Sequence, residues 1–433
     1  MKTTVPMDLN RRTILRQGLI GSAAAAGLLY GGPSVWAAQK VGPGGFSPER
    51  LKDVTKAMQG FVDRGAVGGA VTLLYRKGEI AQVNVLGLQD PKAKTPMARD
   101  SIFRIASMTK PITTVAALML WEEGKYELDT PIDRWLPELA NRKVLIDPAD
   151  PLNSGHPASR PITVLDLMTH RAGIGNPRTK PGPLHDAIKY ADDNNMAGGW
   201  DEWLKRVGEL PLAYEPGSTY HYGNNMDVLG MLVQRVTGIY YPDFLRERIF
   251  KPLGMKDTDM FVPTDKMKRH AGLQDLGRVP AYTIPPADKI PSFVSAAAGL
   301  FSTADDYLQF AKMLLGRGKT GDVRLLRHRT VDYMTTNYLT DEQKKGAPFA
   351  GTAPYWNGQG FGLGVAVKDD LKEMAPDMGA GSPGTFGWPG VFSTWFSVDP
   401  REDMIPIFMV PGGAYDKAMR WAFQAAAYRA IDD

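Results

Sequence analysis

The amino-acid sequence predicts an α/β (α+β) fold: one antiparallel sheet built from both ends of the chain and flanked by helices, with an inserted, mostly helical domain. Strand-like runs lie near residues 70–85 and again after residue 386, whereas apolar residues in the middle of the chain have helical spacing. The chain has 433 residues, of which 43% are hydrophobic, so it can bury a large core. Strand-forming ends around a helical middle indicate that the two ends complete one sheet.

Each expected element has a local signal. Turn residues at 76–79 and 399–403 separate strand-like runs, which predicts an antiparallel pair at each end of the chain. Stretches rich in Pro and Gly predict loops over 147–161 and 178–199. In chain order we expect a helix over 47–62, strands over 70–75 and 80–85, a helix over 303–315, strands over 392–398 and 404–410, and a helix over 414–431. We expect a signal segment at residues 1–37, a sheet domain formed by residues 38–106 and 292–433, and a helical domain at residues 107–291.

The start of the chain resembles a twin-arginine signal peptide. Arg11 and Arg12 precede an apolar run at 18–30 that is too short to span a bilayer, and small residues end the segment at Ala37. We expect cleavage after Ala37. The protein is then periplasmic or secreted, with no stable membrane span once the signal is removed.

Charge and residue usage exclude several classes of function. The formal net charge is +4, but residues 1–37 hold four basic side chains and one acidic one, so about +1 remains for the rest. No basic field for nucleic acid is left. The chain has no cysteine, hence no disulfide and no thiol nucleophile. Its six histidines are scattered without metal-ligand spacing, so we expect neither a metal nor another cofactor, and the sequence carries no signal for an oligomeric state.

Ser107 and Lys110 are the first candidate catalytic residues. They stand three residues apart at a predicted helix start, where Pro111 is tolerated in the first turn and Gly124 is a natural stop. Residues at i and i+3 share a helix face, so the lysine can reach the serine oxygen. Burial and the helix N-terminus favour a neutral lysine that accepts the serine proton, and the N–H of Ser107 can form half of an oxyanion hole. Alone, the pair is also typical of a solvated helix turn.

Tyr222 and Asn224 lie in a second candidate segment, where turn residues lead into an apolar helical run. Such a junction can direct a phenol and an amide into one site. Tyr222 would then shuttle a proton, and Asn224 would orient the substrate or Lys110. The alternative is a helix cap beside a packed ring.

Trp388, Gly390 and Val391 form the third candidate segment, which leads into the C-terminal hairpin. A glycine at a strand edge lets a substrate lie close to the backbone, and the N–H of Val391 could be the second oxyanion donor. Pro389 has no N–H, so it offers no donor. By itself this segment predicts only a hairpin.

In this order the three segments resemble the serine beta-lactamase-like superfamily, specifically the branch of class C beta-lactamases and family VIII carboxylesterases. The resemblance covers residues from about 45 to 430 and implies the beta-lactamase/transpeptidase-like fold with an active site between two lobes. Two positions depart from the lactamase pattern. Ala172 replaces the usual serine after Thr169 and His170. Trp-Pro-Gly at 388–390 replaces Lys-Thr-Gly and is similar to the W-x-G of the esterase branch, although Pro389 stands where glycine is commoner. Further matches are Ser-Met-Thr-Lys at 107–110, Gly-Leu-Phe-Ser-Thr-Ala-Asp-Asp at 299–306 and Phe-Gly-Leu-Gly at 361–364.

The resemblance implies that Ser107 is the acyl-forming nucleophile, Lys110 and Tyr222 are the acid/base pair, and the N–H of Val391 is an oxyanion donor. The remaining candidates, expected to bind substrate, are Asn224, Trp388 and Gly390. For His170, a structural hydrogen-bonding role is the simpler interpretation.

These features predict an exported serine hydrolase, a carboxylesterase acting on small esters. Trp388 offers no cation to a substrate carboxylate, although Arg171 or Lys180 on a neighbouring loop could supply one. An amide-cleaving relative stays open: a beta-lactamase, D-alanyl-D-alanine carboxypeptidase, D-aminopeptidase or oligoamide hydrolase. A non-catalytic wall-binding or sensor module is the alternative outside enzymes, and the joint presence of the three catalytic candidates argues against it.

Overall fold

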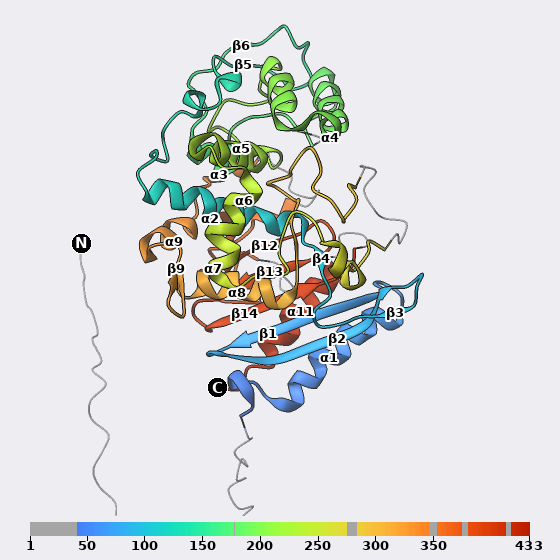
Figure 1. The fold of residues 1–433 in the computed structure, drawn as a ribbon. Coiled ribbons are helices and arrows are strands. Elements are labelled where there is room, and N and C mark those ends of the chain that lie inside the picture. Colours follow the sequence, from blue (N-terminus) through green and yellow to red (C-terminus); the bar gives the residue numbers. More distant parts are fainter. Residues whose placement is uncertain (1–40, 177, 275–283, 346–352, 375–379, 413–416) are drawn as a thin grey trace, which may run out of the picture. The chain divides into compact units, whose positions relative to one another are not determined.

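The computed structural model describes residues 41–433 apart from 177, 275–283, 346–352, 375–379 and 413–416 (Figure 1). These described residues belong to one compact unit. The predicted signal segment lies outside them, as does the predicted start of the last helix. The boundaries between a sheet domain and a helical domain stay a prediction.

An eight-stranded antiparallel sheet is the centre of the fold (Figure 1). Its strands are β1 (Gly69–Arg76), β2 (Glu79–Asp90), β3 (Thr95–Pro96), β10 (Gln359–Phe361), β11 (Ala366–Lys368), β12 (Phe386–Pro389), β13 (Trp395–Val398) and β14 (Met404–Met409). Their order is β10-β11-β12-β13-β14-β1-β2-β3. Strand β1 pairs with β14, with Val71 opposite Met409. Both ends of the chain therefore build one sheet, which confirms the predicted fold class.

Helices cover the sheet and make up much of the middle of the chain (Figure 1). The α-helices are α1 (Pro48–Asp63), α2 (Thr109–Glu122), α3 (Val164–Met168), α4 (Pro183–Glu209), α5 (Asn225–Thr237), α6 (Tyr241–Leu245), α7 (Lys251–Leu253), α8 (Ala304–Leu315), α9 (His328–Met334), α10 (Asp341–Lys345) and α11 (Lys417–Arg429). A π-helical turn, Arg246–Phe250, joins α6 to α7. Short 3-10 turns lie at Pro43–Gly45, Ala106–Met108, Ile132–Arg134, Pro137–Leu139, Thr264–Arg269 and Ala353–Trp356.

Three small ladders connect the loops. They pair β4 (Phe103–Arg104) with β7 (Phe301–Ser302), β5 (Lys143–Val144) with β6 (His156–Pro157), and β8 (Lys319–Thr320) with β9 (Val323–Arg324). The first of them joins the strand before the Ser107 turn to the strand before α8.

Alternate side chains of the sheet enter two separate cores, because successive strand residues point to opposite faces. Leu74 and Phe408 belong to the core that α1 and α11 share. Leu73 and Ile407 belong to the larger core, which includes residues of α2, α5 and α8. The face with the larger core is the one that meets the helix carrying Lys110.

The stretch 178–199 was wrongly predicted to be a loop. Most of it lies in α4, which begins with a proline in its first turn and contains one non-helical residue, Gly199, with a φ of 73°. Leu184, Ile188 and Ala191 recur at helical spacing and are buried. Pro and Gly residues at both ends of this stretch obscured that spacing, since they are usual loop signals.

Candidate active site

Ser107 lies in a tight turn just before α2. The turn is the 3-10 segment Ala106–Met108, and Ala106 has a φ of 45°, a left-handed conformation that is costly for a residue with a side chain. Ser107 is partly exposed, whereas Ala106 and Met108 are buried. The strained turn therefore presents one hydroxyl to solvent from an otherwise buried segment.

Lys110, one turn further along, directs its ammonium back to that hydroxyl. Its Nζ lies 3.0 Å from Oγ of Ser107 and 3.0 Å from the carbonyl oxygen of Ala297. The side chain is buried, and Nζ is 4.6 Å from the centroid of the Tyr222 ring. The i and i+3 spacing thus brings Lys110 to the Ser107 oxygen, as expected from the sequence.

Tyr222 reaches the same serine oxygen from the segment before α5. Its hydroxyl donates to Oγ of Ser107 at 2.7 Å, and it accepts a hydrogen bond from Nε1 of Trp388 at 3.3 Å. The ring is almost fully buried and packs against the ring of Trp388. The structure therefore brings together all three predicted catalytic residues at one oxygen atom.

The pKa of Tyr222 is lower than that of an ordinary tyrosine. Burial on its own would raise this pKa, but the positive charges of Lys110 and Arg178 and the hydrogen bonds at the phenolic oxygen outweigh burial. A tyrosinate is consequently easier to form here than in water. The site holds a base suited to accept the proton of Ser107.

Gly390 lets the end of β12 approach the Ser107 turn closely. A Cβ atom at Gly390 would collide with the Thr394 hydroxyl and the carbonyl oxygen of Ile105. Thr394 also donates to that carbonyl at 3.1 Å, which fixes the approach. The backbone N–H groups of Ser107 and Val391 have no hydrogen-bond partner among the described residues. Two free donors on adjoining segments are what an oxyanion hole requires.

Trp388 and Asn224 are placed differently from the expectation of substrate contact. Trp388 is 0% exposed, so solvent does not reach its ring. Its contact with the site is the hydrogen bond from its indole N–H to the Tyr222 oxygen. Asn224 donates its amide to Asp192 at 3.2 Å, and no hydrogen bond to Lys110 occurs in the described part of the chain. Their roles toward a substrate stay predictions.

Asp227 supports the site and was missed from the sequence. Its Oδ1 accepts hydrogen bonds from the Ser295 hydroxyl at 2.9 Å and from the N–H of Ala297 at 3.0 Å. Burial raises the pKa of this carboxyl group, and the charge of Lys110 opposes that rise. Asp227 thus fastens the segment whose carbonyl group holds Lys110. A carboxylate within the apolar run of α5 was the available signal.

His170 packs directly behind Tyr222, with ring centroids 4.7 Å apart, and is completely buried. Its Nδ1 lies 3.2 Å from the amide nitrogen of Asn225. Burial, followed by the nearby charge of Lys110, holds the pKa of His170 well below its usual value, so the ring is neutral. These contacts fit the structural role expected from the sequence.

Arg178 is a second residue that sequence reasoning missed. It is exposed, and its guanidinium carbon lies 5.1 Å from the centroid of the Tyr222 ring. The two cations suggested by the sequence are engaged elsewhere: Lys180 pairs with Asp147 at 2.7 Å, and Arg171 donates to a threonine hydroxyl at 2.9 Å. No local pattern distinguishes Arg178 from those neighbours in the sequence.

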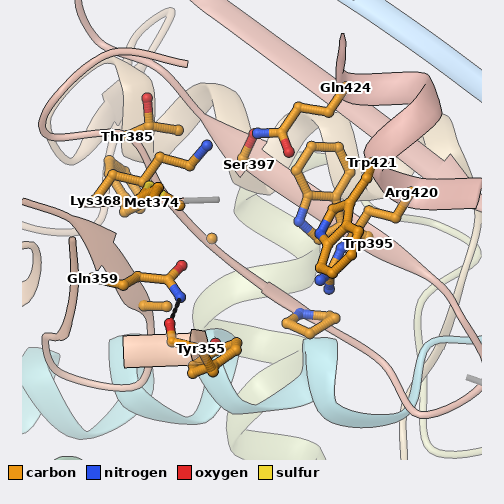
Figure 2. Close-up of a pocket in the computed structure, with 14 residues that line it drawn as sticks. Tyr355, Gln359, Lys368, Met374, Thr385, Trp395, Ser397, Arg420, Trp421 and Gln424 are labelled. Atoms are coloured by element: carbon orange, nitrogen blue, oxygen red, sulfur yellow. Dashed lines mark hydrogen bonds between the residues drawn. The ribbon is translucent and has the colours of Figure 1, made fainter. Parts of the chain in front are cut away.

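The described residues include no cluster of three or more His, Asp or Glu side chains that could hold a metal ion. A separate cavity of about 50 Å³ lies between α11 and strands β11 to β13, where Lys368, Ser397 and Gln424 contribute to its lining (Figure 2). None of the three catalytic candidates lines it. Within the same described residues, no helix is long and apolar enough to cross a membrane.

Residues 54–428 match the family model described as Beta-lactamase. The chain belongs to this family. Esterase EstB of Burkholderia gladioli is 31% identical over 373 residues, covering 80% of this chain and 86% of EstB. Lovastatin esterase of Penicillium rubens is 30% identical over 313 residues, covering 66% and 72%. Protein Rv1367c of Mycobacterium tuberculosis is 42% identical over 352 residues, covering 80% of this chain and 86% of Rv1367c.

Solved structures agree with this family. EstCE1, a hydrolase with promiscuous acyltransferase activity, superposes with a TM-score of 0.73 at 25% identity, covering 88% of this chain and 98% of EstCE1. The predicted family, the predicted fold and the prediction of a serine hydrolase are confirmed. The chain is a serine hydrolase of the beta-lactamase fold whose relatives include esterases and acyltransferases.

Proposed function

We propose that this enzyme hydrolyses small carboxylic esters through an acyl-enzyme on Ser107. The observation that carries the proposal is the Ser107 oxygen, which lies 3.0 Å from the Lys110 ammonium and 2.7 Å from the Tyr222 hydroxyl. Relatives that are named esterases support the ester class.

Acylation begins when the Tyr222 phenolate takes the proton of Ser107, while the Lys110 cation holds the phenolate and the serine oxygen in place. The serine oxygen then bonds to the ester carbonyl carbon. The negative charge that develops on the carbonyl oxygen is met by the N–H groups of Ser107 and Val391. When the tetrahedral intermediate collapses, the bond from carbon to the alkoxy oxygen breaks, and Tyr222 returns its proton to the departing alcohol.

Deacylation repeats these steps with water. Tyr222 takes a proton from a water molecule, and the resulting hydroxide bonds to the acyl carbon. The same two N–H groups stabilise the second intermediate. The bond between the acyl carbon and the Ser107 oxygen then breaks, the serine recovers its proton, and the carboxylic acid leaves.

Two neighbouring reactions differ from this one only in the groups that enter or leave. Amide cleavage requires protonation of an amine leaving group, and the lysine that the lactamase branch directs at the substrate carboxylate is replaced here by Trp388. Acyl transfer requires an alcohol in place of water. Acyltransferase mokF of Monascus pilosus, 28% identical over 363 residues, supports it as a side reaction.

The test compares short-chain p-nitrophenyl esters with nitrocefin and a D-Ala-D-Ala peptide, with and without an added alcohol. We expect the esters to have the highest kcat/KM, Ser107→Ala to abolish turnover, and Tyr222→Phe and Lys110→Ala each to lower the rate at least ~100-fold. Ser382→Ala, which changes a serine outside the site, is the matched control. A higher kcat/KM on nitrocefin or the peptide than on the esters would contradict the proposal and favour an amide-cleaving enzyme.

The proposal includes export to the periplasm or beyond. Its support is Arg11 and Arg12 before a modest apolar run, in the part of the sequence outside the described residues.

A further inference from the structure

We propose that Arg178 is a specificity-determining residue that binds a carboxylate on the substrate, so that the preferred esters carry an acid group. This inference rests on the proposed ester hydrolysis and names the substrate class. Four observations carry it: the position of the guanidinium group, its exposure, the hydrogen bonds that hold its loop, and the absence of a carboxylate partner among the described residues.

The guanidinium group of Arg178 lies over the ring of Tyr222. Its carbon is 5.1 Å from the centroid of the Tyr222 ring, whose hydroxyl donates to Oγ of Ser107 at 2.7 Å. Only the Tyr222 ring therefore separates this cation from the hydroxyl that contacts Ser107, so we place the substrate carboxylate one small acyl or alkoxy group away from the ester carbonyl. Arg178 is exposed, so its N–H groups are open to a ligand from solvent.

A buried network fixes the loop that carries Arg178. The backbone N–H of Arg178 donates to Oδ1 of Asn176 at 2.8 Å, and the N–H of Asn176 donates to the Thr179 hydroxyl at 2.9 Å. That hydroxyl lies 3.0 Å from Nε2 of His221, the residue before Tyr222. Asn176, Thr179 and His221 are all buried. The loop is thus tied to the segment that positions the catalytic tyrosine, rather than resting on the surface.

Gly223 makes this attachment possible on the other side of Tyr222. A Cβ atom there would collide with the side chain of Asn176. Burial, with a further contribution from Arg178, lowers the pKa of His221 to about 4, so His221 is neutral at physiological pH. Asn176, Thr179 and His221 therefore hold the Arg178 loop by hydrogen bonds and close packing, and none of the three brings a negative charge that would neutralise Arg178.

Arg178 forms no ion pair with any carboxylate of the described residues, unlike Lys180, which pairs with Asp147. A guanidinium group binds a carboxylate through two parallel hydrogen bonds. One uncompensated positive charge matches a monoanion, whereas a phosphate dianion would need further donors. A carboxylate is accordingly the chemical class that fits.

The experiment measures a ratio in the full-length mature enzyme: kcat/KM for an ester with a carboxylate divided by kcat/KM for its uncharged match. Monoethyl adipate against ethyl hexanoate places the charge on the acyl side, and 4-butyryloxybenzoate against phenyl butyrate places it on the alcohol side. Release of acid is followed by titration at constant pH. Any effect of Arg178 on Tyr222 itself acts on both members of a pair and cancels.

We expect a ratio above one in at least one pair, and Arg178→Ala to lower it about 10- to 100-fold, as for the loss of one charge-assisted hydrogen bond. Arg178→Lys should recover part of the ratio, because lysine keeps the positive charge but lacks the two parallel N–H donors of the guanidinium group. Lys180→Ala, the removal of a nearby exposed cation, should leave it unchanged. Thermal melting checks folding of each variant, and Arg178→Gln replaces Arg178→Ala if that variant fails to fold.

Unchanged ratios in Arg178→Ala or Arg178→Gln, or equal ratios in Lys180→Ala and Arg178→Ala, overturn the inference while leaving ester hydrolysis intact. Failure of the wild type to cleave any of the four esters overturns the proposed function instead. The two failures are therefore distinguishable.

Discussion

At the scale of single residues, the chemistry depends on which group holds the proton of Ser107. The sequence alone predicts that a neutral Lys110 accepts it, whereas we assign this role to the Tyr222 phenolate. Burial raises the pKa of Tyr222, but the charges of Lys110 and Arg178 outweigh burial and lower it, and its oxygen lies 2.7 Å from Oγ of Ser107. Only the deprotonated phenol can accept that proton. Activity should therefore rise with pH through the pKa of Tyr222 and level off above it, with the rise centred below pH 10, the ordinary value.

Trp388→Phe tests this assignment. The substitution removes the indole N–H that donates to the Tyr222 oxygen at 3.3 Å, and a lost donor destabilises the phenolate, so the pKa of Tyr222 rises. We expect the rise in kcat/KM to move to higher pH, with activity at pH 7 about 10-fold lower, the low end of the range for a hydrogen bond to a charged group. Trp395→Phe, on the opposite face of the sheet, is the control. An unchanged midpoint in the pH dependence of kcat/KM for Trp388→Phe would show that Trp388 does not influence the proton transfer.

At the scale of elements, the site depends on how α5 holds the segment before β7. Asp227 in α5 binds Ser295 and Ala297, and the carbonyl group of Ala297 in turn accepts from Lys110. The helix that follows the tyrosine thus sets the position of the lysine, although none of its described side chains hydrogen-bonds to Ser107.

Asp227→Ala should lower both stability and turnover. It leaves the Ala297 N–H and the Ser295 hydroxyl without an acceptor, which costs about 2 to 4 kcal/mol in the free energy of unfolding. We expect kcat/KM to fall about 10-fold or more as the Ala297 carbonyl shifts from Lys110. Asp227→Asn keeps an acceptor oxygen and should recover most of the stability. Urea unfolding and ester turnover measure the two effects. Full turnover in Asp227→Ala would show that Lys110 needs no such anchor.

Sequence patterns predicted those parts of the site that local spacing determines. Ser107 and Lys110 share a helix face, and Tyr222 precedes a helix, so their segments carried signals of their own. Contacts across the fold carried none: the donor from Trp388 to Tyr222 joins residues 166 positions apart, and Arg178 is one of several loop cations. The order of the three motifs, through the family resemblance, was what joined the segments.

At the scale of the whole molecule, the predicted signal concerns how the chain reaches its place of action. Arg11→Lys with Arg12→Lys should leave the precursor in the cytoplasm, because twin-arginine export depends on that pair. Fractionation of cells followed by immunoblotting measures it, and a double variant at Lys52 and Lys56, exposed in α1, is the control. Unchanged periplasmic yield in the Arg11, Arg12 variant would contradict the assignment.

The pairing of β1 with β14 has a consequence for synthesis. Residues 69–76 are translated first, whereas their partner, residues 404–409, follows only after residues 77–403 have been translated. Contacts so distant in sequence form slowly, and the partly made chain exposes apolar strand edges until they do. The turn that carries Ser107 likewise depends on a segment translated late, because Gly390, which packs against it, follows β12. A polypeptide that stops before residue 386 therefore lacks a complete catalytic centre, although it already contains Ser107, Lys110 and Tyr222.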